Sequence, residues 1–535
     1  SLWSQLESTM KHSLIPAMLA ALFLCVPAVT SQAVDFQIKG QWNMGFGLAD
    51  TKFTSYIRNG SGTKIKSNNN DRFAARQRLL LQLDAVASES LSGTVMFHIG
   101  PQKWGFGPQG GAMGADGVFV KVRQAYIDWK VPDTTIQTRM GIQNFAMPYA
   151  AGGSAVFDLR GASINSHVDF NENIGLTAMW FRPYNDNYTG SNDTDGTNGY
   201  LNNNDNAGYL DNMDLFALML PVNYGGVSVT PWAMYGVQGR NAHNFDDYRT
   251  TNFVDGAPAV TLSPYLNAMG GGGGLNVTDY GRTSKAYGGM FWAGLPVKIK
   301  TFDPWNIEFD VNYGWVESMG RFDVKTRNDD SDIRRGSSKR EGWLAKALVE
   351  YKMDWGTPGI FGWYGSGDDG SVKNGSERMP SVCPYVWMTS FMGDGNLAWG
   401  PNGDYLDLND SMAGTWGIGF QLSDMSFVDK LTHTFRVAYW GGTNSPSMVK
   451  YMDSAYAWQS TSNLFEGPYL TTNDGLLEFN LVNVYQMYEN FNINLELGYV
   501  ANFMDNDTWK KDYNNFGSYE KQDIWKAQLI FTYKF

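Results

Sequence analysis

Apolar and polar residues alternate along much of the chain, and the clearest example is the stretch 523–535. Every second residue there is apolar or aromatic, and the positions between are mostly polar: Trp525, Ala527, Leu529, Phe531, Tyr533 and Phe535 against Lys526, Gln528, Thr532 and Lys534. Successive side chains of a strand point to opposite faces, so the pattern predicts a strand with one apolar and one wet face. Such a strand, about thirteen residues long, is typical of a transmembrane β-barrel. A two-sided strand of a soluble sandwich is the alternative for this stretch alone.

The same alternation occurs near the amino terminus and in between. In residues 34–46 the apolar face is Phe36, Ile38, Trp42, Met44 and Phe46. Clear repeats of the pattern lie at 91–99, 305–313, 343–351, 431–439 and 491–499. Matching first and last strands are what closing a barrel requires, since each covers an edge of the other.

The connections between these segments alternate in length. Short ones lie at 88–90, 132–134, 171–173, 222–224 and 489–490, and long polar ones at about 50–71, 101–116, 184–210, 237–284, 318–340, 367–412, 442–473 and 504–522. This asymmetry predicts an all-β fold, a transmembrane antiparallel up-and-down barrel with short periplasmic turns and long extracellular loops. We expect about 18 strands. Sixteen is the alternative, because 118–131 and 476–488 have no clean period.

The first 33 residues have the parts of a secretory signal peptide. We expect Met10 to be the true start, preceded by an extension; Lys11 and the apolar run 14–29 then lead to the small-residue site Ser31-Gln32-Ala33. Cleavage after Ala33 leaves residues 34–535 as a single barrel domain. No other segment approaches the roughly 18 apolar residues of a membrane helix.

Composition and charge narrow the function. Aromatic residues make up 15%, charged residues 18%, and there are 60 glycines, which suits one-sided strands joined by Gly-rich loops. The net charge of −12 argues against nucleic acid as a partner. Loss of Cys25 with the signal peptide leaves Cys383 alone, so no disulfide framework is expected. No histidine has a nucleophile or carboxylate at catalytic spacing, so we expect neither an enzyme nor a cofactor.

Several short motifs resemble bacterial outer-membrane porins, especially the homotrimeric porin family of sulfate-reducing bacteria. They are Val34-Asp35-Phe36 after the signal peptide, Arg76-Gln77-Arg78-Leu79, the stretch 91–97, the stretch 123–128 and the terminal Phe535. The resemblance implies a homotrimer in the outer membrane of a Gram-negative bacterium, in contact with lipid and lipopolysaccharide, through which small hydrophilic solutes diffuse passively. It also implies that the terminal aromatic residues Phe531, Tyr533 and Phe535 are an assembly signal for the barrel-assembly machinery.

Basic residues on the wet strand faces are the candidate selectivity site. Arg76 and Arg78 share a face, as do Lys121 and Arg123, and Arg139 follows on the next strand. A basic wall in the lumen lowers the barrier for anions. The alternative is that these side chains only pair with carboxylates such as Asp84 and Asp128 and hold the wall together.

An inward-folded loop is expected to narrow the pore opposite this wall. Candidates are the Gly-rich segment 104–117 and the segment 144–160, which contains Asp158; we favour the second, by its position in the chain. The predicted function is a diffusion porin with or without anion preference. The alternatives are a sugar-type channel with an aromatic track of Trp104, Trp387 and Trp399, or a structural or adhesive barrel. Asp193 and Asp195 start like a calcium loop but lack its closing Glu, so a hydrated loop is favoured over a metal site.

Overall fold

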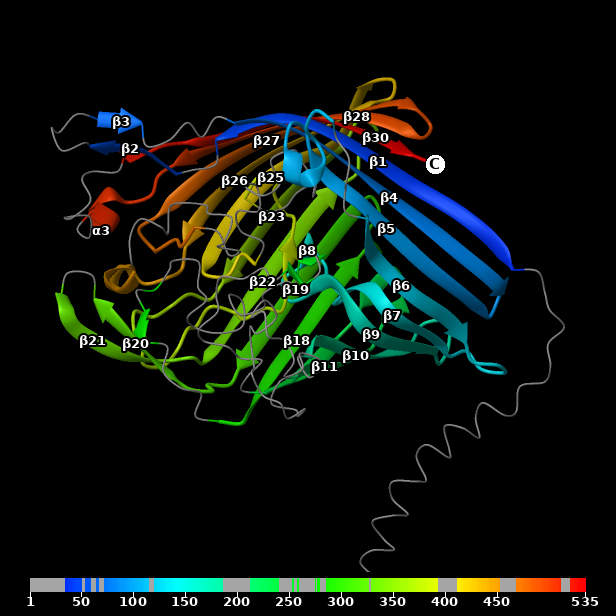
Figure 1. Cartoon of the computed structure of the whole chain (residues 1–535), viewed down its shortest axis with the longest axis horizontal. Helices are drawn as coiled ribbons and strands as arrows, with labels where there is room; N and C mark the ends of the chain where they lie inside the picture. Colours follow the sequence, from blue (N-terminus) through cyan, green and yellow to red (C-terminus); the bar gives the residue numbers. More distant parts are fainter. Residues whose placement is uncertain are drawn as a thin grey trace, which may run out of the picture.

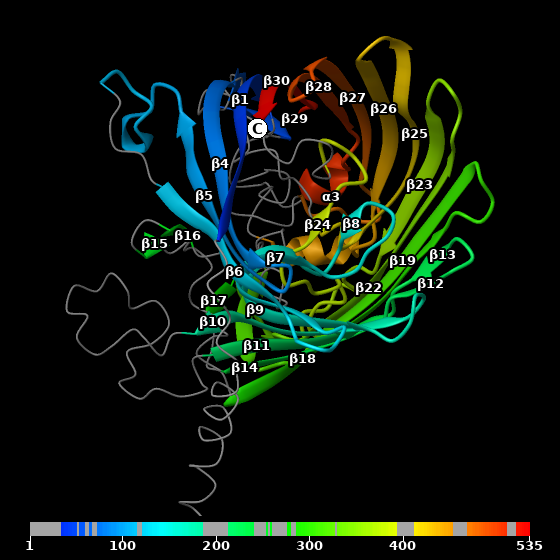
Figure 2. The same ribbon diagram turned by 90° about the vertical axis from the view of Figure 1, so that its right-hand side faces the viewer.

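Antiparallel strands form one closed barrel (Figures 1 and 2). The computed structural model describes residues 34–50, 53–58, 64–66, 72–114, 120–185, 212–239, 253–254, 257–258, 275, 277–279, 285–326, 329–392, 411–452, 468–510 and 520–535. The wall strands are β1 (Asp35–Asp50), β4 (Arg72–Ser88), β5 (Leu91–Lys103), β6 (Val120–Lys130), β7 (Gln137–Ala146), β9 (Asp158–Asp169), β10 (Gly175–Asn185), β11 (Asn212–Met219), β14 (Trp232–Gly239), β18 (Tyr287–Ile299), β19 (Trp305–Val316), β22 (Arg340–Tyr351), β23 (Thr357–Gly365), β25 (Thr415–Val428), β26 (Leu431–Gly442), β27 (Gly475–Tyr488), β28 (Phe491–Asn502) and β30 (Ile524–Lys534).

The wall has eighteen strands, which confirms the first of the two predicted counts. The main sheet contains twenty strands, but two of these, β12 (Val222–Tyr224) and β13 (Val227–Val229), only continue β11 and β14 toward their turn. The prediction of a turn at 222–224 was therefore wrong; the turn is at Gly225 and Gly226, both with positive φ.

The two ends of the domain close the barrel as predicted. β1 pairs with β30 from Gln41 opposite Lys534 to Asp50 opposite Trp525, and with β4 on its other edge. The amide and carbonyl of Gly40 and Phe535 bond to each other at 2.9 and 3.1 Å. Both edges of β1 are thus covered, so the ring has no free edge at this seam.

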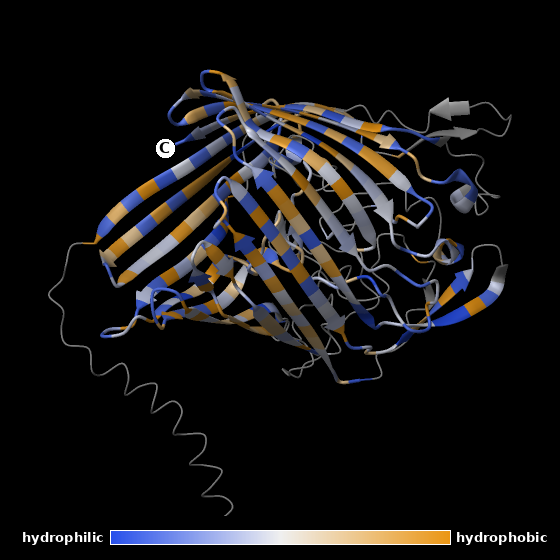
Figure 3. Cartoon of the chain, turned by 180° about the vertical axis from the view of Figure 1, so that it is seen from behind, coloured by the Kyte–Doolittle hydropathy of each residue, from blue (hydrophilic) through white to orange (hydrophobic). Residues whose placement is uncertain are grey.

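The outer face of the barrel exposes large apolar side chains, and the inner face carries buried charged groups beside an apolar core. Ile360 and Ile418 are 59% and 58% exposed on the outer face, whereas Asp310, Lys346 and Glu478 are at most 2% exposed on the inner face. Figure 3 shows the resulting alternation of apolar and polar residues along the strands. Large apolar side chains also turn inward and form a core, so the feature that differs from a water-soluble protein is the number of them exposed on the outer face.

The two segments that lack a clean alternation of apolar and polar residues, 118–131 and 476–488, form β6 and β27. The structure explains the irregular pattern of each. A register shift opposite Met96 and Phe97 marks a bulge in β6, which adds a residue between its upper and lower parts. β27 carries apolar residues on both faces, because Leu476 and Val482 turn inward and are buried.

Short elements accompany the wall. Three small sheets contain β2 (Thr54–Arg58), β3 (Lys64–Lys66) and β29 (Glu520–Lys521); β17 (Val277–Asp279), β20 (Arg321–Thr326) and β21 (Asp329–Ser337); and β15 (Phe253–Val254) and β16 (Ala257–Pro258). The helical turns η1 (Gly107–Gln109), η5 (Pro446–Tyr451) and α3 (Asn506–Lys510) lie in connections. Among the described residues, no helix has the length and apolar character needed to cross a membrane.

Candidate functional site

The end of the β7–β9 hairpin leaves the wall and enters the lumen (Figure 2). Residues 143–146 and 158–161 pair with each other, but within the described part of the chain they pair with neither β6 nor β10. The departure follows Gly141, which has a φ of +131° and where a Cβ would lie 2.3 Å from the carbonyl oxygen of Ala125. Only glycine permits this close approach, so the residue type fixes where the hairpin bends away.

The segment between these strands, residues 147–157, reaches the opposite wall and is called the first inner segment. The amides of Ala150 and Ala151 donate to the carboxylates of Asp310 (3.4 Å) and Glu308 (2.8 Å) on β19. Lys346 on β22 donates to the carbonyls of Ala150 (3.0 Å) and Gly153. Of the two candidate loops, the structure therefore places 144–160 inside the barrel.

The other candidate loop folds back on its own strands. The amide of Trp104 donates to the carbonyl of Ala75 (2.9 Å), and the indole donates to Gln77 (3.1 Å). Its ring also packs edge-on against Phe46 on the outer face of β1, at 5.1 Å. The predicted sugar track is therefore wrong for Trp104, which lies outside the lumen, and Trp399 lies outside the described residues.

A second segment also enters the lumen, and the sequence did not indicate it. Residues 366–392, called the second inner segment, were expected in an extracellular loop. Their strand β24 (Tyr385–Val386) pairs with β8 (Gly153–Ser154) of the first inner segment. The two segments are thereby joined into one body inside the ring, where Figure 2 shows β8 and β24.

Residues on the two faces of the strand region 382–387 of the second inner segment differ in burial. Val382 and Val386 are at most 1% exposed and pack in the apolar core, whereas the alternating residues Cys383, Tyr385 and Trp387 are only half-buried. The ring of Tyr149, from the first inner segment, lies edge-on to Trp387 with centroids 6.5 Å apart. The inner body therefore presents two phenols, an indole and a thiol.

A basic cluster on β4, β6 and β9 faces the strip of the inner body that is formed by Tyr149, Cys383, Tyr385 and Trp387. The charges of Arg76, Arg123 and Arg160 act on Arg78, as does Tyr385 on the inner body. Arg160 also interacts electrostatically with Cys383. Guanidinium groups from separate strands thus converge opposite the inner body, and Asp158 is the carboxylate beside them.

His98 on β5 belongs to the same cluster. Arg123 Nη1 lies 3.2 Å from His98 Nδ1. A guanidinium can only donate, so Nδ1 is the acceptor and the imidazole is neutral in this arrangement. Arg160 and His98 were missed as site residues. For Arg160 the available signal was its place two residues after Asp158.

The other predicted residues lie as follows. Arg76 is 6% exposed on the inner face of β4, and Lys121 acts electrostatically on His98. Arg139 lies farther along the wall and pairs with both oxygens of Asp128, at 2.6 and 2.9 Å, while it stacks on Tyr126. Arg139 thus makes the wall pairing given as the alternative. Asp193 and Asp195 lie outside the described residues, and the described residues contain no cluster suited to a metal ion.

A carboxylate-rich corner lies in the second inner segment near its start. Burial raises the pKa of Glu377 to about 7, and the charges of Asp368 and Asp369 act in the same direction. The Glu377 carboxylate accepts from the Asp369 amide (3.0 Å) and from Asn374 (2.9 Å). These two donors favour the carboxylate and offset part of the effect of burial.

Comparisons with known proteins match folds and not sequences. No protein-family model matches the chain, and no curated protein matches it. Several solved structures match the chain over nearly its whole length at 10–11% sequence identity. OccAB2 of Acinetobacter baumannii is 11% identical with a TM-score of 0.46 over 94% of this chain and 98% of its own. OccK11 (OpdR) of Pseudomonas aeruginosa is 10% identical with a TM-score of 0.44 over 93% and 95%, and OccK2 (OpdF), solved with glucuronate, is 10% identical with a TM-score of 0.46 over 94% and 98%.

Proposed function

We propose that this protein is an outer-membrane porin that lets small hydrophilic solutes diffuse through a water-filled passage beside the inner body. The observation that carries the proposal is a closed barrel whose outer face exposes large apolar side chains. Apolar side chains as exposed as Ile360 and Ile418 would be unfavourable in water but suit hydrocarbon.

A preference for anions is the second part of the proposal. It is supported by the guanidinium groups of Arg78, Arg123 and Arg160, which converge opposite the inner body. Low-dielectric walls concentrate their field in the passage, which favours entry of anions.

Bilayer recording of the purified protein tests both parts. Ion conductance is expected for the wild type, and Arg76→Ala/Arg78→Ala should shift the reversal potential in a salt gradient toward cations. Lys39→Ala is the matched control, because Lys39 pairs with Asp84 at 3.0 Å on the wall and not with the cluster. Absence of any conductance would instead favour a structural or adhesive barrel with a closed lumen.

A sugar-type channel is the second candidate, and the pairing of Tyr149 with Trp387 favours it. Aromatic faces and edges inside a channel can bind sugar rings, while nearby polar groups bind hydroxyls. Saturating block of the current by an added sugar, lost in Trp387→Ala, would support this candidate.

Export, trimer formation and assembly are also proposals. Residues 1–33 lie outside the described residues, so mass spectrometry of the mature protein should test for a start at Val34. A homotrimer should migrate at three times the monomer mass on a gel before boiling and at the monomer mass afterwards. Contacts with lipopolysaccharide and the barrel-assembly machinery follow from the proposed location.

A further inference from the structure

Both inner segments are fastened to the wall by the same arrangement of groups. In each case a buried lysine ammonium donates to one or two backbone carbonyls of the segment, and carboxylates on another wall strand accept its backbone amides. Lys346 and Asp310 do this for the first inner segment, with nitrogen and oxygen 3.5 Å apart. Lys526 and Glu478 do this for the second.

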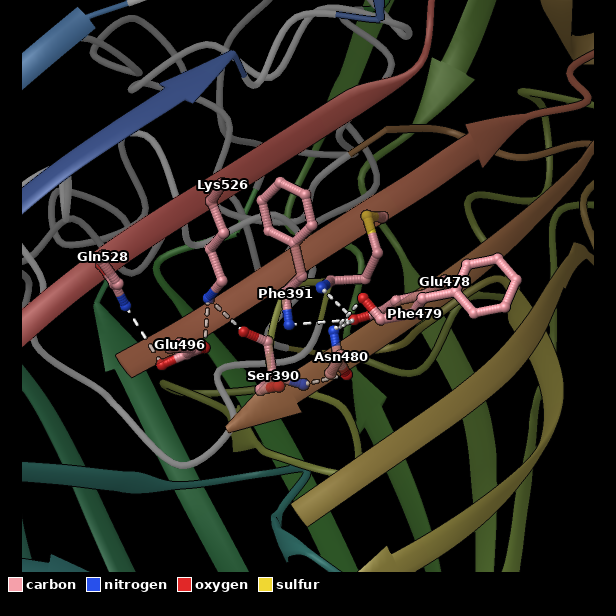
Figure 4. A network of polar contacts seen from close by, with 9 residues as sticks. Ser390, Phe391, Glu478, Phe479, Asn480, Glu496, Lys526 and Gln528 are labelled. Carbon is pink, nitrogen blue, oxygen red and sulfur yellow. Dashed lines mark hydrogen bonds and ion pairs between the residues drawn. The ribbon is translucent and has the colours of Figure 1, made fainter. Parts of the chain in front are cut away.

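The fastening of the second inner segment is shown in Figure 4. Glu478 Oε1 accepts from the amides of Phe391 (2.9 Å) and Met392 (3.1 Å), and Asn480 accepts from the amide of Ser390 (2.9 Å). Lys526 donates to the carbonyl of Ser390. Three consecutive amides and one carbonyl of the segment are thus satisfied by wall side chains.

The lysine is held in place by the wall itself. Lys526 Nζ lies 2.5 Å from Glu496 on β28, and Gln528 donates to the other oxygen of that carboxylate (3.2 Å). The side chains of Glu496 and Lys526 are 0% and 4% exposed.

These buried charges are not needed to close the barrel. The backbone pairing of β27, β28 and β30 already does that, and apolar side chains would avoid the cost of taking two charges out of water. The backbone of an irregular segment, by contrast, has amides and carbonyls that require partners when buried. The buried charges therefore supply hydrogen-bond partners that the backbone of the inner segment requires and that the wall does not.

We propose that Lys346 with Asp310, and Lys526 with Glu478, are positioning residues that hold the joined inner segments across the lumen and thereby set the width of the passage. The statement about width rests on the proposed channel function. The β8–β24 pairing makes the two fastenings cooperate, because a segment released at one wall remains tied through its partner to the other.

The test compares three variants of the full chain in detergent. Lys526→Met removes the ammonium, and Lys526→Met/Glu496→Gln also removes the charge that the first change strands. Gln528→Met is the matched control, since Gln528 is 2% exposed on the same strand and bonds to Glu496 but not to the segment. Hydrogen exchange of the amides of residues 390–392, followed by mass spectrometry, reports the fastening, and heat-dependent gel migration confirms a folded barrel.

Both lysine variants should exchange these amides about tenfold faster than the wild type, as expected for loss of one hydrogen bond to a charged group. Their single-channel currents should be larger and noisier, and the control should match the wild type. Wild-type exchange in the double variant would overturn the proposal, because the effect would then come only from a stranded Glu496. Equal effects in Gln528→Met, or no effect in either lysine variant, would overturn it as well.

The hydrogen-exchange result and the conductance result can fail independently of each other. If the wild type does not conduct, the channel proposal fails, while exchange at residues 390–392 still decides whether the lysines hold the segment. If the wild type conducts and exchange is unchanged, only the positioning role fails.

Discussion

The thiol of Cys383 can report the sign of the potential at the proposed constriction. It is half-buried on the strip that faces the basic cluster and interacts electrostatically with Arg160. Methanethiosulfonate reagents of similar size exist with a sulfonate or a trimethylammonium group. We predict that the anionic reagent modifies Cys383 faster than the cationic one.

The size of the effect follows from the local charges. Three guanidinium groups, those of Arg78, Arg123 and Arg160, face one nearby carboxylate, that of Asp158. One unit charge at 4 Å in water is worth about 1 kcal/mol. A potential of that size raises the local concentration of a monovalent anion about fivefold and lowers that of a cation about fivefold. The ratio of the two rates should therefore be about 25-fold higher than for a thiol in solution.

The assay is the loss of channel current, or the mass increase, with each reagent over time. Rates are divided by those for 2-mercaptoethanol, so that the intrinsic reactivity of the reagents cancels. Cys383→Ser should react with neither, and Arg160→Gln should reduce the ratio severalfold. A normalised ratio of one or below in the wild type would refute the basic cluster as the dominant field at this point.

Three further predictions concern the carboxylate-rich corner around Glu377, the seam between β1 and β30, and the bend of the β7–β9 hairpin at Gly141. The pKa of Glu377 is raised to about 7 from 4.5, so its stabilising contribution is complete at pH values below the unfolded pKa and is lost as the pH rises through 7. Hydrogen exchange of residues 366–378, corrected for intrinsic rates, should therefore be faster at pH 8 than at pH 5.5. The substitution Glu377→Gln should remove this difference. Deletion of Phe535 removes both backbone bonds to Gly40 and should lower the fraction of heat-modifiable barrel, whereas Phe427→Ala, at an exposed position near the end of β25, should not. Gly141→Val should prevent the hairpin from bending inward and so enlarge the conductance; Gly93→Ala, where a Cβ meets nothing closer than 4.0 Å, is its control.

The barrel could be predicted because its cause is repeated in every strand. Lipid outside and water inside demand a period of two, and the requirement for closure makes β1 and β30 match. Prediction was least secure at β6 and β27, where a bulge and inward apolar residues break the period. In both strands the inward-facing side chains contact the inner segments or the neighbouring wall and not lipid, so the lipid does not determine their polarity.

The inner body could be predicted only in part. Segment 144–160 adjoins the basic strands, and Gly141 within a strand pattern was a local sign of close backbone approach. The second inner segment has no such sign, because its contacts join residues far apart in the sequence, such as Phe391 and Glu478. A polar stretch with turn residues predicts an irregular connection, but not the side of the wall on which it lies.

The net charge of the chain also gave no guide to the charge of the passage. The protein carries −12 overall, yet the groups opposite the inner body are mainly guanidinium groups. The buried carboxylates of β19, β27 and β28 have local partners. Glu478 accepts backbone amides, Asp310 lies beside Lys346, and Glu496 lies beside Lys526. Because the fastening of the inner segments uses these carboxylates, we propose that they contribute little field to the passage, and that Arg78, Arg123 and Arg160 give it the proposed preference for anions. The positioning lysines and the proposed anion preference are therefore linked: release of an inner segment would expose carboxylates to the lumen and should weaken the preference for anions.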